Sequence, residues 1–307
     1  MALDYVELDH DLKEIAALDQ EEDDADKLAQ IEQQRVAAGV DPRIAELQAE
    51  LTAAQVDEKR IHLENDADEM RQKLAHLTGL PADGLTPVSS SVPPPPTLST
   101  DGEDQLAAQN NAGIAAAYAN AKSKFFVAFG DARQKWRPTV SFGAEYGYLE
   151  PFADYTTYYK KFTYNNAGIG FQITLPIFDA AKRAQAQASA AAAAQAQAQA
   201  DESRNKISEQ TLTLQRTVSE LAAQQRVAQI QNQIAQEQLT SVEGELANGT
   251  GSPLAPTVTP IQARQAEIQE RERYEDLLDA NFALMKVELN LLRATGQITN
   301  WIQSSLK

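Results

Sequence analysis

The sequence predicts a mainly α-helical protein with one β-hairpin, in which very long antiparallel helices pack side by side as in coiled coils. Three observations support this prediction. Apolar residues recur at three- and four-residue steps over much of the chain, a breaker-poor stretch over 179–247 begins with a tract of Ala and Gln, and the apolar period changes to two near the middle. Aromatic residues make up only 7% of the chain, which is typical of packed helices rather than of a thick globular core.

Residues 1–80 are predicted to form a helical hairpin. Leu8 and Leu12 begin an apolar helical spacing that continues to about residue 38, and a second helix follows. Gly39 suits the C-cap of the first helix, and Pro42 suits the first turn of the second. We therefore expect the chain to reverse direction sharply at this turn.

The rest of the chain is predicted to be a linker followed by a second unit. Residues 81–102 are rich in Pro and Ser, and their proline run cannot donate backbone hydrogen bonds and favours extended polyproline geometry. The helix over 179–247 would be roughly 100 Å long at about 1.5 Å per residue. The predicted elements of the second unit, 103–307, are a helix over 103–135, a β-hairpin over 138–178, and two long helices over 179–247 and 261–294.

The two units share a pattern that indicates an internal repeat. Each has a long helix, a glycine turn, a proline and then a helix that ends in Thr-Gly. The stretch from Pro42 to Gly79 is nearly as long as the stretch from Pro260 to Gly296. The first repeat therefore lacks a hairpin and half of its ascending helix.

Two segments of alternating residues form the predicted hairpin. One face of each segment is apolar and the other carries Gly and polar residues, which is the pattern of a strand in a membrane β-barrel. The loop over 149–164 concentrates aromatic residues where an interfacial girdle would lie, and Trp136 lies at the opposite end. A soluble hairpin packed on helices remains an alternative. The residues predicted to face lipid are Val140, Phe142, Tyr146, Tyr148, Ile169, Phe171, Ile173 and Leu175.

Composition excludes several classes of function. The net charge of -17 would repel nucleic acid, and the absence of Cys excludes disulfide scaffolds, thiol catalysis and Cys-bound zinc. No stretch is apolar enough for a membrane-spanning helix, and the acidic start lacks the regions of a signal peptide, so an exported form is expected to begin upstream of Met1. We therefore expect the chain to be a fragment or a truncated gene product.

No catalytic or metal-binding motif stands out, so the sequence predicts no enzyme, no cofactor and no metal site. The three histidines, His10, His62 and His76, are scattered, and we expect structural or exposed roles for them. The acidic run from Glu21 to Asp24 is predicted to be a solvated helix face, with the lining of an acidic passage as the alternative.

Two blocks of sequence carry a resemblance to a known family. The blocks are ARQKWRPTVSFGAEYGY over 132–148 and GIGFQITLPIFD over 168–179. Together they resemble the second-repeat hairpin of TolC-like outer-membrane efflux proteins. Residues 103–296 match one full repeat of that family, and residues 2–81 match the later part of the other.

The resemblance implies a homotrimer with a twelve-stranded transmembrane β-barrel in the bacterial outer membrane, four strands from each subunit, continuous with a helical tunnel in the periplasm. It implies a passive duct for efflux or type I secretion, docked through a periplasmic adaptor (membrane fusion) protein to an inner-membrane transporter. The periplasmic tips that would contact the adaptor are Gly39, Val40, Gly249 and Thr250.

One departure from the family concerns the constriction after the second tip. Where the family often has carboxylates, this chain has Gln262 and Gln265, so an acidic gate is not expected. The alternative to an export duct is a soluble periplasmic coiled-coil scaffold or adaptor protein, which would be monodisperse in water without detergent.

Overall fold

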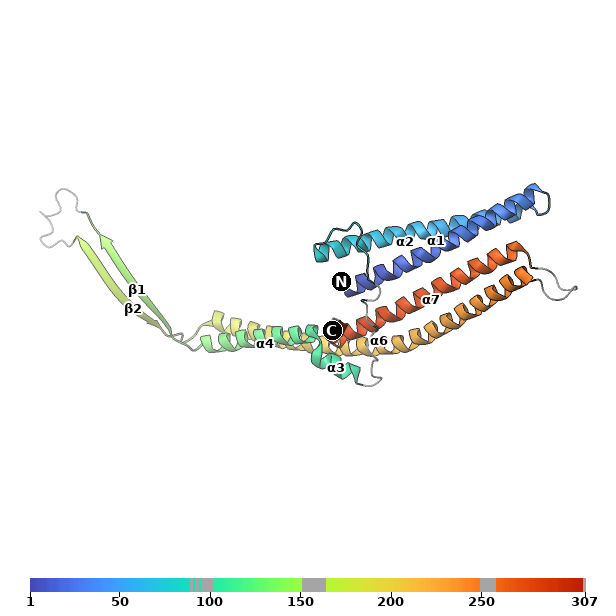
Figure 1. Ribbon diagram of the computed structural model, residues 1–307. Coiled ribbons are helices and arrows are strands. Elements are labelled where there is room, and N and C mark those ends of the chain that lie inside the picture. Colours follow the sequence, from blue (N-terminus) through green and yellow to red (C-terminus); the bar gives the residue numbers. More distant parts are fainter. Residues whose placement is uncertain (89–90, 92–93, 95–101, 151–163, 249–257, 306–307) are drawn as a thin grey trace. The chain divides into compact units, whose positions relative to one another are not determined.

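The computed structural model describes residues 1–88, 91, 94, 102–150, 164–248 and 258–305, and Figure 1 shows their helices and sheet. The chain divides into two compact units, one of residues 1–111 with 207–307 and one of residues 112–206. Among the described helices, none combines the length and the apolar character that crossing a lipid bilayer requires. The elements are α1 (Ala2–Ala37), α2 (Arg43–Thr78), α3 (Glu103–Asn110), α4 (Ala112–Gln134), β1 (Thr139–Tyr148), β2 (Asn165–Thr174), α6 (Ala180–Asn248), α7 (Pro260–Ala294) and α8 (Ile298–Ser305).

In the first unit, α1 packs against both α2 and α7. The buried contacts form small separate clusters along the helices, and Ala is frequent in them, so the helix axes can approach closely. Leu8, Ala67 and Leu74 form one cluster between α1 and α2, whereas Val6 joins Leu289 of α7 in another. These narrow seams agree with the sparse apolar spacing of the sequence.

Charged side chains reinforce the contacts between these helices. Arg60 of α2 donates from Nε to Oε2 of Glu22 on α1 at 2.7 Å. Arg264 of α7 donates from Nη1 to Oδ1 of Asp24 on α1 at 3.0 Å. The acidic run on α1 is thus partly neutralised by cations from both neighbouring helices.

The second unit combines the β-hairpin with helices that contact through small side chains. Ala121 of α4 is buried against Ala196 and Ala200 of α6. Beside them, the Tyr118 hydroxyl donates to Oδ1 of Asp201 at 2.7 Å. The Ala-rich start of α6 therefore serves to bring two helices close together.

The structure divides the region predicted as one helix over 103–135 into α3 and α4. Asn111 between them is extended, with φ −70° and ψ 120°, and its Nδ2 donates to the carbonyl oxygen of Ala294 at 2.8 Å. This bond to the end of α7 replaces helix continuation. The two compact units also cross the boundaries of the sequence repeats, because α7 packs on α1 of the other repeat.

Candidate functional site

The hairpin of β1 and β2 is antiparallel, and its register places the predicted apolar residues on one face. Val140 lies opposite Ile173, and Phe142 lies opposite Phe171, with ring centroids 5.0 Å apart. Since alternate residues of a strand share a face, the side chains predicted to face lipid form one continuous surface. All eight, including Leu175 directly after β2, are between 61% and 75% exposed.

The opposite face of the hairpin is small and polar. Gly143 pairs with Gly170, and Ser141 pairs with Gln172. Glycines on this face leave the backbone accessible, and polar side chains can meet water. The hairpin is therefore two-sided, with one apolar and one hydrophilic surface.

Aromatic residues gather at the end of the hairpin that joins α4 and α6. Trp136 and Phe178 are both exposed, and the Arg183 guanidinium lies 5.7 Å and 4.6 Å from their ring centroids. On α4, Phe125 and Phe126 are also exposed, which the sequence analysis did not single out although the pair is evident in the sequence. Of the loop aromatics predicted to form a girdle at the other end, Tyr164 is exposed, and those at 152–162 lie outside the described residues.

The predicted tip between α1 and α2 is a tight turn. Gly39 has φ +73°, a left-handed conformation that favours glycine, and Val40 is exposed. The Arg35 guanidinium donates to the Asp41 carboxylate across the turn. The other predicted tip residues, Gly249 and Thr250, lie outside the described part of the chain.

The residues predicted for a constriction, Gln262 and Gln265, lie in the first turns of α7 and are both exposed. Gln262 has a local partner. Its Oε1 accepts from the backbone N–H of Thr259 at 2.9 Å, while its own backbone N–H donates to the Thr259 hydroxyl at 3.3 Å. The Gln262 side chain is thus engaged in a capping box at the start of α7.

The sequence predicts that the acidic run is a solvated helix face. This prediction is wrong for Glu21. Its side chain is only 4% exposed and faces Glu275 of α7. Burial, followed by hydrogen bonding to Glu275, raises the pKa of Glu21 to about 8. The Glu21 carboxyl is thus protonated at neutral pH and can donate to the Glu275 carboxylate.

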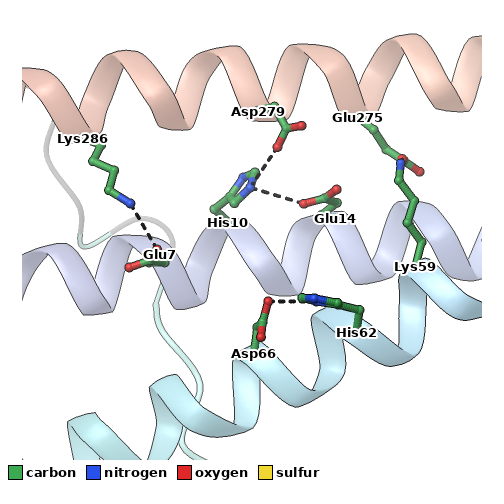
Figure 2. A network of polar contacts seen from close by, with 9 residues as sticks. All are labelled: Glu7, His10, Glu14, Lys59, His62, Asp66, Glu275, Asp279 and Lys286. Carbon is green, nitrogen blue, oxygen red and sulfur yellow. Dashed lines mark hydrogen bonds and ion pairs between the residues drawn. The ribbon is translucent and has the colours of Figure 1, made fainter.

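Figure 2 shows a second polar cluster in the same unit, formed by His10 and Glu14 of α1 with Asp279 of α7. Nε2 of His10 lies 3.3 Å from Oε2 of Glu14 and 3.2 Å from Oδ1 of Asp279. Burial lowers the pKa of His10, but hydrogen bonds to Asp279 and Glu14 outweigh it and raise the pKa to about 9. The four-residue step from His10 to Glu14 is visible in the sequence, whereas the contribution of Asp279 requires the fold.

No family model matches the sequence, and no curated protein matches it by sequence. Solved structures do match. The outer-membrane protein VceC of Vibrio cholerae superposes with a TM-score of 0.69 at 20% identity, covering 96% of this chain and 68% of VceC. The CmeC outer-membrane channel of Campylobacter jejuni gives 0.71 at 13% identity, with 99% and 65% covered.

The open state of the MtrE outer-membrane channel of Neisseria gonorrhoeae gives a TM-score of 0.70 at 15% identity, with 97% of this chain and 65% of MtrE covered. The chain thus spans about two thirds of the length of these channels. The resemblance in fold that the sequence indicates is confirmed: helices and hairpin have the TolC-like arrangement of outer-membrane channels.

Proposed function

We propose that this chain is a subunit of a bacterial outer-membrane channel, a passive export duct through the periplasm and outer membrane for a tripartite efflux or type I secretion system. The observation that carries the proposal is the exposed apolar face of the hairpin. Removing one large apolar side chain from water stabilises a protein by about 1.5–3 kcal/mol, so a surface that exposes eight of them favours lipid.

The structural relatives support the same proposal. The CmeC and MtrE structures are of outer-membrane channels, and this chain shares their fold over nearly all of its length. Trp136 and Phe178, which share Arg183 at the end of the hairpin, would lie at one membrane boundary, because aromatic rings favour the interface between lipid and water.

We infer that the duct works as a homotrimer with a periplasmic adaptor and an inner-membrane transporter as partners. The two strands of the described sheet cannot close a barrel, so further strands are needed, and those of the other subunits would be among them. The exposed turn at Gly39 and Val40, with Gly249 and Thr250 of the second tip, would contact the adaptor. In this assembly the duct itself catalyses no reaction.

Gln262 and Gln265 are the proposed residues of the constriction near the second tip. Both are exposed at the start of α7, which suits residues that line a passage. Amide side chains would make such a constriction polar without adding charge. Gln265 is the better candidate of the two, because Gln262 is engaged in the capping box.

Single cysteines test the hairpin directly, since the natural chain has none. We would prepare Phe171→Cys, Gln172→Cys and Ile173→Cys, attach an environment-sensitive fluorophore, and reconstitute the full chain in liposomes. The labels at 171 and 173 should be quenched by nitroxide lipids, and the label at 172 by aqueous iodide. Equal access of iodide to all three positions would contradict a lipid-facing surface.

A transport assay tests the duct as a whole. In cells that lack their own export channel, expression of the chain fused to an export signal should lower the accumulation of a fluorescent efflux dye. Ile169→Arg, in the middle of the strand, should abolish this effect, because a cation at the lipid face costs about 2–4 kcal/mol near the bilayer midplane, whereas Gln172→Arg on the other face should retain it. A chain that stays monodisperse in water and does not enter liposomes would instead be a soluble scaffold.

A further inference from the structure

We propose that His10, Glu14 and Asp279 form a binding site for a divalent transition-metal ion of the zinc type, which would join α1 to α7. The inference does not depend on the export function. It rests on the positions of three donor atoms that two separate parts of the chain bring together, as drawn in Figure 2.

The spacing of the donor atoms suits one ion. The imidazole Nε2 lies 3.3 Å from the Glu14 oxygen and 3.2 Å from the Asp279 oxygen, and all three donor atoms lie within 4.8 Å of one another. Zinc binds His nitrogen and carboxylate oxygen at about 2.0–2.2 Å, so two donors of a tetrahedral ion lie roughly 3.4 Å apart. The side chains therefore need little movement to bind it.

The surrounding residues hold the imidazole in place. The Phe282 ring of α7 stacks on His10 with a centroid distance of 4.4 Å and an interplanar angle of 5°. His10 and Glu14 are separated by one helical turn, so both project from the same face of α1. An ordered imidazole is a better metal ligand than a freely rotating one, because less conformational entropy is lost on binding.

The charges and accessibility of the cluster also favour a cation. Binding would displace the proton of the His10 imidazole to solvent, and two carboxylates with the neutral imidazole then balance the charge of a divalent ion, so zinc should bind more tightly as the pH rises. The side chains of His10 and Glu14 are about 10% and 9% exposed, whereas Asp279 is 63% exposed and leaves a route from solvent. Three protein donors leave one position for water.

Two lysines drawn beside the cluster in Figure 2, Lys59 and Lys286, do not neutralise it. Lys59 pairs with Glu275, and Lys286 pairs with Glu7.

His62 provides a matched control on α2. Its Nδ1 lies 3.0 Å from Oδ2 of Asp66, also four residues further along a helix, but both side chains are largely exposed. It lacks a third donor from another helix among the described residues. The two histidines thus share local spacing and differ in the tertiary ligand.

The test is isothermal titration of the untagged full chain with zinc chloride alone. We expect one saturable zinc site per chain. The affinity for zinc should be about tenfold or more weaker in both His10→Ala and Asp279→Asn, and it should be unchanged in His62→Ala. Asp279→Asn is included because an exposed position tolerates substitution, so its loss of binding cannot be attributed to misfolding. Circular dichroism verifies that each variant is folded.

X-ray absorption at the zinc edge should show one imidazole nitrogen with oxygen ligands. In thermal unfolding, zinc should raise the melting temperature of the natural chain but not that of His10→Ala. Two results would overturn the proposal. One is the absence of a saturable site up to about 1 mM zinc. The other is equal zinc affinity in the natural chain and in His10→Ala.

Discussion

Nζ of Lys59 on α2 donates a 2.7 Å hydrogen bond to Oε2 of Glu275 on α7, whose side chain is only 3% exposed. The same carboxylate faces the protonated carboxyl of Glu21 on α1. A buried negative charge is costly unless it is paired, and here the two partners come from two other helices. The cluster therefore links all three helices at one level of the first unit.

Lys59→Met should destabilise the chain, because Glu275 would keep its buried position without a cation. We expect a loss of about 1–3 kcal/mol in the free energy of unfolding, less than for a fully buried pair since the Lys59 side chain is 59% exposed. Urea unfolding followed by circular dichroism measures it. Lys73→Met, which removes an exposed pair with Glu69, is the control and should have little effect.

Glu21→Gln should change how stability depends on pH. The pKa of Glu21 is raised from 4.5 to about 8, so between these values the folded chain retains a proton that the unfolded chain has lost. The free energy of unfolding contributed by this group is therefore complete below about pH 4.5, and it decreases as the pH rises to about 8. Glu275, Glu272 and Lys59 are the charged groups around it.

In Glu21→Gln this decrease should be absent. Each unit of pKa difference corresponds to about 1.4 kcal/mol, so at least that much of the change between pH 5 and pH 8 should disappear. Unfolding in urea at the two pH values measures it. Glu50→Gln, at an exposed position of α2, should leave the pH dependence as it is. An unchanged slope in Glu21→Gln would mean that Glu21 is ionised in the folded chain.

Gly296→Ala should cost more stability than Gly79→Ala, although the two glycines end equivalent helices of the repeats. Both have positive φ, 72° and 74°, which costs an alanine about 1–2 kcal/mol. A Cβ at Gly296 would also lie 2.5 Å from the carbonyl oxygen of Asn110, whereas one at Gly79 meets nothing within 4 Å. The free energy of unfolding should fall by about 1–3 kcal/mol more in Gly296→Ala than in Gly79→Ala. An equal loss in both variants would contradict the close approach of Gly296 to Asn110.

Thr259→Ala and Gln262→Ala should both weaken the start of α7. Loss of the Thr259 cap costs about 0.5–2 kcal/mol, and Gln262 is its reciprocal partner. Chemical unfolding measures this, and Gln265→Ala, which removes no cap, should be nearly neutral. If the constriction forms at Gln265, single-channel conductance should change in Gln265→Ala while stability does not.

Local patterns predicted most of the elements. The change of period identified both strands, and the residues alternating from Val140 and from Ile169 do share a face, because strand geometry follows directly from the order of residues. The lack of Pro from 179 to 247 predicted one long helix, and α6 is continuous from Ala180 to Asn248. The turn after α1 was likewise predicted from neighbouring residues, Gly39 and Pro42, and Gly39 has the positive φ that such a turn requires.

Features that depend on distant partners could not be predicted in this way. Asn111 interrupts a helical sequence because its amide reaches Ala294, far along the chain. Glu21 reads as a surface residue until α7 supplies Glu275, and His10 lacks its second carboxylate until α7 supplies Asp279. In each case the deciding neighbour comes from packing rather than from spacing.

The sheet of β1 and β2 has two strands in the described part of the chain, so each strand pairs along one edge only. The backbone groups on the outer edges can bond to water, but hydrocarbon offers them no partner except another strand. Transfer of the hairpin from water to lipid therefore requires several chains to act together. By mass action, insertion should rise more steeply than in proportion to chain concentration, and dilution should reverse it.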